Sequence, residues 1–363
     1  MKIMADYILS RHMQRILSLA RRLSAHDVTT LTEEQIAELN NRSIPKNWMT
    51  RRLLSRPMKY VDTKTFIIPV KDGAVTAYYF EPRHDKNDVI GVIPLIVFYH
   101  GGGWMIGNME LYNILCSRLA SETHSIILSV DYRLAPRHKF PTAVEDCYAA
   151  LEWAAQGARY WKADPDRIFL AGDSAGGNLA TVVSRLARDR KGPHIAGQML
   201  LYPVTDGRMR TDSYIEHEDS PTLTKKEIAF YIQNYQKEPK DILNPDFSPL
   251  LSTDLSRLPP ALIIGAEYDP LKDDGRLYAQ ALEAADSPAR YLEVKQTVHG
   301  FIIYPSATGS LETESAMKQF IDGRTLESIS LTTQKELKRQ AREELKQARR
   351  TNKNLIEASI GER

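Results

Sequence analysis

Gly172-Asp173-Ser174-Ala175-Gly176-Gly177 is the stretch of this 363-residue sequence that decides the fold. It follows a short apolar run, Arg167–Ala171, and precedes a run with helical periodicity, Asn178–Ala187. A sharp strand-to-helix turn strains the backbone of its central residue and requires small residues two positions to either side, which Gly172 and Gly176 supply. Such a turn lifts the Ser174 hydroxyl clear of a sheet and directs the N–H groups of a helix N-terminus toward it. The flanking strand and helix patterns disfavour an incidental glycine-rich loop.

Eight short β-rich runs alternate with helical patterns around this motif. Lys71-Asp72-Gly73 separates the first two runs and predicts an antiparallel hairpin. The later runs are continuous and apolar, as in strands buried on both faces of a parallel sheet. We therefore predict an α/β fold with a mostly parallel eight-stranded sheet and helices on both faces. The predicted strands are Thr65–Val70, Val75–Phe80, Leu95–Tyr99, Ser125–Val130, Arg167–Ala171, Gln198–Tyr202, Ala261–Gly265 and Arg290–Val294.

Two helical stretches and a charged tail lie outside this alternation. We expect residues 1–60 to form an N-terminal helical cap region and residues 61–322 to form the main α/β domain. About sixty residues separate the sixth and seventh predicted strands, which is far more than one crossover requires, so a cap insertion is predicted at about 205–245. Residues 323–363 are expected to be a charged helical extension, in which Lys335–Arg350 carries seven basic and three acidic residues. Both a solvated helix and a self-association helix fit this tail.

The composition excludes several classes of protein. With 48 basic and 46 acidic residues, the net charge is +2, so no overall field attracts nucleic acid or an anionic membrane. Met1–Arg22 mixes apolar residues with arginines and lacks the uncharged core of a signal peptide. No apolar run approaches the roughly 18 residues needed to span a bilayer. We expect a cytoplasmic protein without nucleic-acid partners or stable membrane insertion, with reduced, buried Cys116 and Cys147; a homo-oligomer is left open.

A second glycine-rich stretch, Tyr99-His100-Gly101-Gly102-Gly103-Trp104, follows the third predicted strand. Consecutive glycines after a buried strand free backbone N–H groups to face a ligand, and the sequence matches the His-Gly-Gly-Gly loop that binds oxyanions. A phosphate-binding loop is disfavoured, because the stretch has neither Gly-x-Gly-x-x-Gly spacing nor a Gly-Lys-Ser/Thr ending. His100 opens the loop, so we expect it to be structural rather than catalytic.

A serine nucleophile needs a histidine to take its proton and a carboxylate to orient that histidine. Of the nine histidines, only His299 follows the last predicted strand in a short loop. Asp269 follows the seventh predicted strand, and Ser, Asp, His is the chain order of α/β-hydrolases. Glu267, Asp273 and Asp274 compete with Asp269 for the role of the acid, although the last two also suit a helix start.

Four stretches together carry a family resemblance over about residues 60–305: His100–Trp104, Asp131–Pro136, Gly172–Gly177, and Asp269-Pro270-Leu271 with His299-Gly300-Phe301. The chain resembles the hormone-sensitive-lipase branch of the α/β-hydrolases, in the group with a Gly-Asp-Ser-Ala-Gly-Gly motif. The resemblance implies a carboxylesterase fold with a helical cap and no cofactor. It also implies an oxyanion hole formed by the backbone N–H groups of Gly102, Gly103 and Ala175, and structural roles for Asp131 and Arg133.

We therefore expect a serine carboxylesterase that hydrolyses short- to medium-chain esters of small molecules through an acyl-enzyme. The expected catalytic residues are Ser174, Asp269 and His299, and no metal is expected. Trp104 beside the oxyanion loop, and Tyr231 and Tyr235 on the predicted cap helix, are expected to fill the space above the serine and keep the pocket short. The alternatives are an amidase or deacetylase on the same fold, and a non-catalytic small-molecule-binding protein of this fold. The complete set of motifs disfavours the non-catalytic protein.

Overall fold

The computed structural model describes residues 7–23, 27–45, 47–54, 57–83 and 92–332. Its centre is a single eight-stranded sheet with the strand order β1-β2-β4-β3-β5-β6-β7-β8. The β1–β2 and β2–β4 pairs are antiparallel, and the other neighbouring pairs are parallel. The predicted mostly parallel sheet is confirmed, and so are all eight strands. Their bounds are β1 Val61–Val70, β2 Gly73–Pro82, β3 Ile93–Tyr99, β4 Ile126–Asp131, β5 Ala163–Asp173, β6 Gly197–Leu201, β7 Ala261–Tyr268 and β8 Ala289–Val298.

Several strands are longer than the apolar runs that predicted them. The strand β8 continues four residues beyond the predicted Val294, and β7 continues three beyond Gly265. In β8 the added residues Lys295 and Gln296 are exposed and lie at a register shift, between the pairs Ala266–Val294 and Tyr268–Val298, so no apolar pattern marks them in the sequence. As predicted, β1 and β2 form an antiparallel hairpin, in which Val70 pairs with Gly73 and Asp72 adopts a positive φ of 59°.

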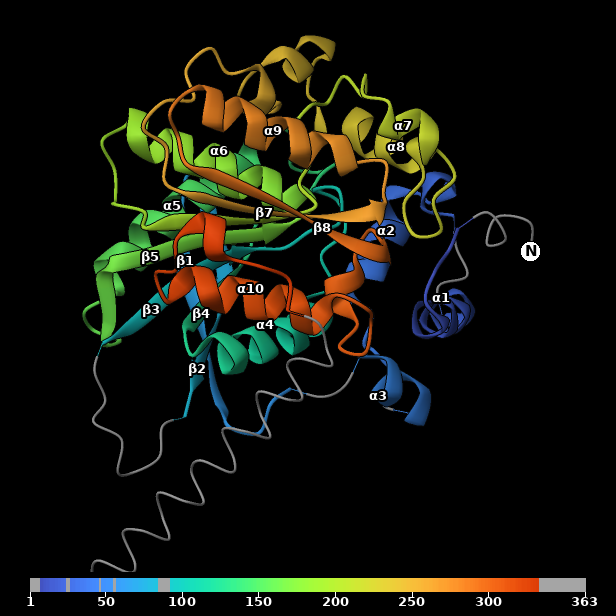
Figure 1. Ribbon diagram of the computed structural model, residues 1–363, viewed down its shortest axis with the longest axis horizontal. Coiled ribbons are helices and arrows are strands. Elements are labelled where there is room, and N and C mark those ends of the chain that lie inside the picture. Colours follow the sequence, from blue (N-terminus) through green and yellow to red (C-terminus); the bar gives the residue numbers. More distant parts are fainter. Residues whose placement is uncertain (1–6, 24–26, 46, 55–56, 84–91, 333–363) are drawn as a thin grey trace, which may run out of the picture.

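Helices cover both faces of the sheet (Figure 1). On one face lie α5 (Thr142–Gly157), α6 (Ala175–Asp189) and α9 (Lys272–Ala284). On the other face lie α4 (Met109–Thr123) and α10 (Ser310–Ile321). This arrangement confirms the α/β-hydrolase architecture predicted from the alternation of strands and helices.

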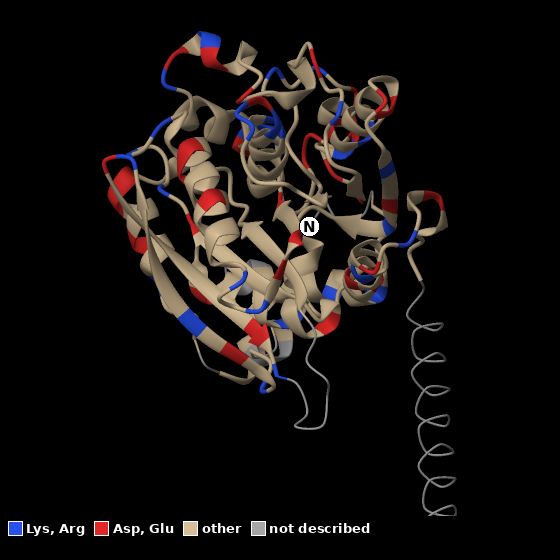
Figure 2. Ribbon diagram, turned by 90° about the vertical axis from the view of Figure 1, so that its left-hand side faces the viewer, with Lys and Arg blue, Asp and Glu red and all other residues tan. Residues whose placement is uncertain are grey.

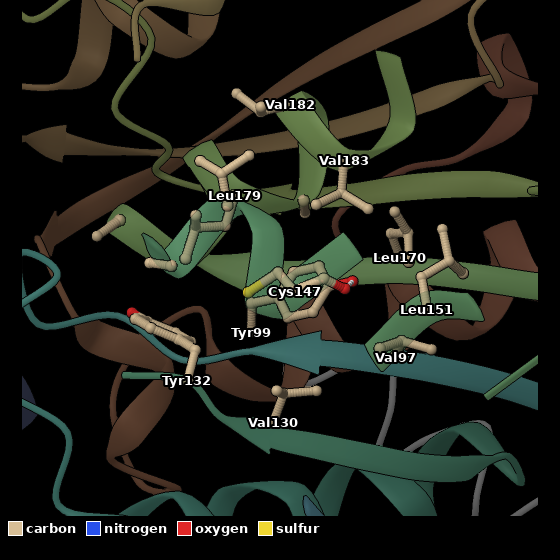
Figure 3. Close-up of a cluster of buried hydrophobic side chains, with 14 of the residues drawn as sticks. Val97, Tyr99, Val130, Tyr132, Cys147, Leu151, Leu170, Leu179, Val182 and Val183 are labelled. Carbon is tan, nitrogen blue, oxygen red and sulfur yellow. Dashed lines mark hydrogen bonds between the residues drawn. The ribbon is translucent and has the colours of Figure 1, made fainter. Parts of the chain in front are cut away.

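Alternate residues of β3 show how the sheet divides two hydrophobic cores. Val97 and Tyr99 belong to the core under α5 and α6, whereas Ile96 and Phe98 belong to the core under α4 and α10. Figure 3 shows Val97 and Tyr99 with Leu151 in the first core. Burial of each large apolar side chain contributes about 1.5–3 kcal/mol relative to its exposure. The two cores therefore hold the central strand, and the loop that follows it, in a fixed position.

The N-terminal part packs around this sheet rather than joining it. It contains α1 (Arg11–Leu23), α2 (Glu33–Asn41) and α3 (Trp48–Leu54). The apolar side of α1, including Met13 and Leu17, is buried in the core that also contains α4 and α10. The side chain of Asn40 on α2 donates to the carbonyl of Met105 at 2.9 Å and accepts from the amide of Gly107 at 3.0 Å. The N-terminal part therefore supports the loop after Trp104.

The segment between β6 and β7 is irregular, as its predicted role as an insertion requires. It contains the short helix α7 (Ser213–Glu216), α8 (Lys225–Tyr235) and the 3₁₀ turns Pro239–Leu243 and Pro249–Leu251. A capping box starts α8, because Thr224 accepts from the amide of Glu227 and the Glu227 carboxylate accepts from the amide of Thr224.

Acidic and basic residues are interspersed along the helices and loops in the view of Figure 2. Within the described ranges, no helix has both the length and the apolar character that a bilayer crossing needs. The two cysteines are free and buried. The predicted charged helix over Lys335–Arg350 lies outside the described residues.

Candidate active site

Ser174 lies at a sharp turn between β5 and α6, where the sequence predicted it. Its φ of 55° and ψ of −119° are strained for a residue with a side chain. Its amide donates to the carbonyl of Leu201 on β6 at 2.8 Å, which ties the turn to the sheet. A Cβ on Gly176 would overlap the carbonyl oxygen of Tyr99, and one on Gly172 would overlap the carbonyl of Gly176. The two glycines therefore let the strand and the helix approach each other around Ser174.

The glycine loop after β3 has the backbone conformation that its sequence requires. Gly102 and Gly103 have φ values of +107° and +61°. A Cβ on Gly102 would overlap the carbonyl of Ile106, and one on Gly103 would overlap the ring of Tyr231. In the part of the chain that the structure describes, the amides of Gly102, Gly103 and Ala175 donate no hydrogen bond to the protein. These three N–H groups remain able to bind an oxyanion.

His299 and Asp269 form a buried hydrogen-bonded pair. Nδ1 of His299 lies 2.7 Å from Oδ2 of Asp269, and the side chain of Asp269 is fully buried. The other carboxylate oxygen of Asp269 accepts from the amide of Leu271 at 2.9 Å. The pair has the geometry in which a carboxylate fixes the tautomer of a histidine and leaves Nε2 for proton transfer.

The competing carboxylates lie elsewhere. Asp273 and Asp274 are in the first turn of α9, as the helix-start alternative predicts. Asp274 accepts from the amides of Thr205 and Asp206, and Glu267 accepts from the amide of Gln296. Burial raises the pKa of Asp274 to about 8. Among the four candidate carboxylates, only Asp269 contacts His299 by a hydrogen bond.

A cavity of about 260 Å³ brings most of the predicted site residues together. Ser174, His299, Gly102 and Gly103 all line it. Most of its remaining wall is apolar and comprises Ile106, Leu111, Val204, Leu223, Ile228, Leu271 and Ile303. A larger groove of about 740 Å³ between α2 and the 131–138 loop contains none of Ser174, Asp269 and His299, so cavity size alone does not locate this site.

The three predicted pocket aromatics have different positions. Trp104 and Tyr231 line the cavity, but Tyr235 does not. Tyr235 is fully buried behind Trp104, with the two rings stacked at a centroid distance of 4.5 Å. Tyr235 therefore supports the wall from behind.

The two predicted cap stretches also differ. Thr222, Leu223, Ile228 and Tyr231 of the insertion line the cavity, whereas no described residue of the 1–60 stretch does. The expectation that both stretches bound the pocket is therefore met only by the insertion. The N-terminal stretch instead packs its apolar residues on the sheet side and supports the loop after Trp104.

Asp173 links the turn at Ser174, here called the nucleophile turn after its predicted role, to the glycine loop. Its carboxylate accepts from the amide of Gly101 at 2.8 Å and from the Tyr112 hydroxyl at 3.2 Å. Burial raises the pKa of Asp173 to about 6. The motif showed Asp173 only as a neighbour of the serine, and no sequence pattern indicated its partner Tyr112.

His100 has a structural environment, as expected. It is fully buried and stacks on Tyr132 at a centroid distance of 4.2 Å. Burial lowers its pKa to about 4, so the ring is neutral at physiological pH. Arg133 pairs with Asp146 at 2.6 Å, away from the cavity lining.

Further residues near His299 had no recognisable sequence signal. The centroids of the Tyr202 and His299 rings are 4.6 Å apart. Thr222 donates to the His299 carbonyl at 2.9 Å. Within the described ranges, no three side chains of His, Cys, Asp or Glu are grouped to hold a metal ion.

A family model described as alpha/beta hydrolase fold matches residues 96–303, which span the glycine loop, Ser174, Asp269 and His299. The chain belongs to the α/β-hydrolase family. Within it, the chain belongs to the hormone-sensitive-lipase-like branch that its motifs resemble.

Individual α/β-hydrolases are similar over most of this chain. Carboxylic ester hydrolase LipN of Mycobacterium tuberculosis is 40% identical over 273 residues, covering 72% of this chain and 71% of LipN. An arylesterase of Saccharolobus solfataricus is 38% identical over 245 residues, covering 67% of this chain and 78% of that protein. The solved structure of a hyperthermophilic esterase from Pyrobaculum calidifontis has a TM-score of 0.76 and 34% identity, covering 86% of this chain and 97% of that one.

Proposed function

We propose that this protein is a serine carboxylesterase that hydrolyses short- to medium-chain esters, with Ser174 as nucleophile, His299 as base and Asp269 as the orienting acid. Ester hydrolysis itself follows from family membership and from relatives named as carboxylic ester hydrolase and arylesterase. The observation that carries the residue assignment is the shared cavity, which Ser174, His299, Gly102 and Gly103 all line.

The reaction proceeds in two acyl-transfer steps. His299 takes the Ser174 proton as the hydroxyl attacks the ester carbonyl, and the amides of Gly102, Gly103 and Ala175 stabilise the oxyanion. His299 then gives its proton to the leaving alcohol, and the acyl group remains on Ser174. Water repeats the attack, with His299 again as base, and releases the acid. Asp269 holds the imidazole in the required tautomer and stabilises its protonated form.

Substrate length is limited by the size of the cavity. Its volume of about 260 Å³ lies just below the range of about 300–1,000 Å³ typical of small-molecule pockets. Trp104 and Tyr231 are bulky wall residues, and Tyr231 packs directly on Gly103. Short acyl and alcohol groups therefore fit without rearrangement of the insertion, which we assign as the cap over residues 205–245 of a 61–322 catalytic domain.

The chain-length dependence of kcat/KM tests this proposal. On p-nitrophenyl esters from acetate to palmitate, we expect a maximum between the acetyl and hexanoyl esters. A maximum at twelve carbons or more contradicts the short pocket. Hydrolysis of p-nitroacetanilide at a higher kcat/KM than p-nitrophenyl acetate favours the amidase alternative, and the absence of turnover on every ester contradicts the proposed activity.

A further inference from the structure

Three hydroxyl side chains of the insertion donate to backbone carbonyls beside Asp269 and His299. Ser213 donates to Pro270 at 2.6 Å, Ser220 donates to Tyr268 at 2.8 Å, and Thr222 donates to His299 at 2.9 Å. We propose that Ser213, Ser220 and Thr222 form a hydroxyl clasp whose function is to align Asp269 and His299 for catalysis. The inference rests on the proposed roles of Asp269 and His299, and it makes the three hydroxyl residues positioning residues.

The clasp holds the backbone on both sides of Asp269. Tyr268 and Pro270 are its two chain neighbours, and the carbonyl of each accepts a hydrogen bond from a hydroxyl of the insertion. Ser213 and Ser220 are 0% and 2% exposed, so water does not compete freely for these two bonds. Rotation of the Asp269 backbone away from His299 would break at least one of these buried hydrogen bonds.

The clasp also holds His299, where the local chain gives little steric support. Thr222 binds the carbonyl of His299 itself. The next residue, Gly300, has a φ of +76°, and an added Cβ there would meet nothing within 4 Å. Glycine at an unpacked position has wide conformational freedom. The carbonyl of Gly300 accepts from the amide of Ile303 within the loop, and the Thr222 hydroxyl adds a bond to the His299 carbonyl from outside the loop.

The insertion is itself ordered where it provides these hydroxyls. Backbone bonds from Ser220 to His217 and from Lys225 to Glu218 close the loop before α8. The amide of Ser213 donates to the carboxylate of Asp273 at 3.1 Å. The clasp therefore joins two ordered parts of the protein, the insertion and the sheet edge.

The same part of the insertion forms the pocket wall. Thr222 and Leu223 line the cavity together with Ile228 and Tyr231 of α8. An acyl group that fills the cavity therefore contacts the segment that holds His299.

The test uses the full-length protein and the Thr222→Val variant, which keeps the side-chain shape and removes the hydroxyl. Because small misplacements of catalytic groups can cost about a hundredfold in rate, we expect kcat on p-nitrophenyl butyrate to fall about 10- to 100-fold, with KM nearly unchanged. Thr222→Ser keeps the hydroxyl and is expected to restore most of kcat. Ser213→Ala and Ser220→Ala are expected to lower kcat in the same direction.

Ser252→Ala is the matched control. Ser252 lies in the same segment between β6 and β7, just beyond the insertion, and also donates to a backbone carbonyl, that of Asp254 at 3.0 Å, but it contacts neither Asp269 nor His299. We expect its kcat to match that of the wild type. Equal losses of kcat in Ser252→Ala and Thr222→Val would overturn the clasp, because they would indicate a general loosening of the segment between β6 and β7.

A second readout separates alignment from stability. The proton on Nδ1 of His299, bound to Asp269, can be followed by its downfield NMR signal, and we expect Thr222→Val to shift or broaden that signal while Ser252→Ala leaves it unchanged. A folded Thr222→Val variant with wild-type kcat and an unchanged signal overturns the proposal. If Ser213→Ala or Ser220→Ala fails to fold, the comparison of Thr222→Val with Thr222→Ser decides whether the clasp aligns His299.

Ser174→Ala, measured in parallel, separates the clasp from the proposed function. If Ser174→Ala retains esterase activity, the proposed catalytic role of this site is wrong, and the clasp is overturned with it. If Ser174→Ala is inactive while Thr222→Val keeps wild-type kcat, only the clasp is wrong. Both the proposed function and the clasp are supported if Ser174→Ala is inactive, kcat of Thr222→Val is low, and Thr222→Ser has nearly the wild-type kcat.

Discussion

The nucleophile turn and the glycine loop are both rich in glycine, but glycine has a different function in each. At the turn, Gly172 and Gly176 are required because backbone atoms of neighbouring elements lie where a Cβ would be. In the loop, Gly102 and Gly103 are required because other atoms lie where a Cβ would be and also because both have positive φ values. The obstacle at Gly102 is backbone, whereas the obstacle at Gly103 is the side chain of Tyr231.

The turn therefore acts as part of the scaffold, whereas the loop forms part of the pocket wall. The turn joins β5 of the sheet to α6, and the carbonyl oxygen of Tyr99, which crowds both Gly172 and Gly176, belongs to a residue that pairs with Gly172 in the sheet. The loop contacts the insertion, whose side chains can be exchanged. Substitutions at the turn should therefore be irreparable, and at least one substitution in the loop should be repairable by a second change.

Ser174→Ala has the largest expected effect on activity. The variant loses the nucleophile, so kcat should fall by about a millionfold, to the assay background. The fold should be unaffected, because the Ser174 hydroxyl donates no hydrogen bond in the described part of the chain. Ester hydrolysis and the thermal midpoint of unfolding, measured on the same sample, check both points. A retained activity of more than a few per cent contradicts the assignment of Ser174.

Gly176→Ala tests the turn as scaffold. The new Cβ would overlap the Tyr99 carbonyl and lie 2.6 Å from the His100 carbonyl. We expect a loss of at least about 3 kcal/mol in the free energy of unfolding, at the upper end for overpacking, together with loss of activity.

Gly177→Ala is the control in the same helix turn. Its new Cβ would lie 3.0 Å from the Cβ of Pro203 and 3.2 Å from the carbonyl oxygen of Gly172, which is less crowded than the overlap at Gly176, and a gain in helix propensity of about 1 kcal/mol partly offsets these contacts. Urea unfolding of both variants makes the comparison. Equal stabilities of Gly176→Ala and Gly177→Ala would show that the close approach to Tyr99 is not a constraint.

Gly103→Ala tests whether the loop is repairable. Displacement of an oxyanion-hole donor typically lowers kcat by about 10²- to 10³-fold, and we expect a loss in this range. Tyr231→Ala removes the ring that the new methyl group would overlap, so kcat of the double variant should be about tenfold higher than that of Gly103→Ala. The remaining loss is due to the positive φ of an alanine, which costs about 1–2 kcal/mol.

Gly102→Ala provides the matched comparison for this rescue. Its new methyl group would overlap the backbone carbonyl of Ile106, which no side-chain substitution removes. Tyr231→Ala should therefore leave the kcat/KM of Gly102→Ala unimproved. Rescue of both glycine variants by Tyr231→Ala, or of neither, would remove the distinction between the two positions.

Local patterns predicted the parts of the molecule that the sheet determines. The apolar runs located all eight strands, and the glycine motifs located the turns that bear Ser174 and the oxyanion loop. These features are readable because strand burial and turn geometry each restrict nearby residues. The C-terminal extension of β8 was missed because Lys295 and Gln296 are exposed and lie at a register shift, which interrupts the apolar run.

The walls and supports of the site were less predictable. Tyr231 and Tyr235 lie one turn apart on α8, yet only Tyr231 lines the cavity, because Trp104 stands in front of Tyr235. An aromatic side chain has the same helical signal whether it forms the wall or the packing behind it. Ser220 and Thr222 resemble ordinary loop residues, since their partners lie 48 and 77 positions away in the sequence.

Asp173 joins the two regions, and its removal has the smallest expected effect on activity. Asp173→Asn keeps an oxygen that accepts from the amide of Gly101, so kcat should change by only a few-fold. The larger consequence is on the pH dependence of stability. Burial raises the pKa of Asp173 to about 6 in the folded protein, from 3.8 for an exposed aspartate. The folded state therefore binds more protons than the unfolded state between about pH 4 and 6, and this group makes stability fall as pH rises through that interval.

The contribution of Asp173 is isolated by subtracting the two stability curves. Burial also raises the pKa values of Asp131, Glu314 and Asp274, which act in the same direction in both proteins and cancel in the difference. The wild type should lose up to about 1 kcal/mol per pH unit more than Asp173→Asn between about pH 4 and 6, and the two curves should be parallel above about pH 7. Urea unfolding at each pH measures both curves. Parallel curves throughout would show that Asp173 is ionised at the same pH in the folded and unfolded chains, and that the link between the turn and the glycine loop is already a carboxylate at pH 4.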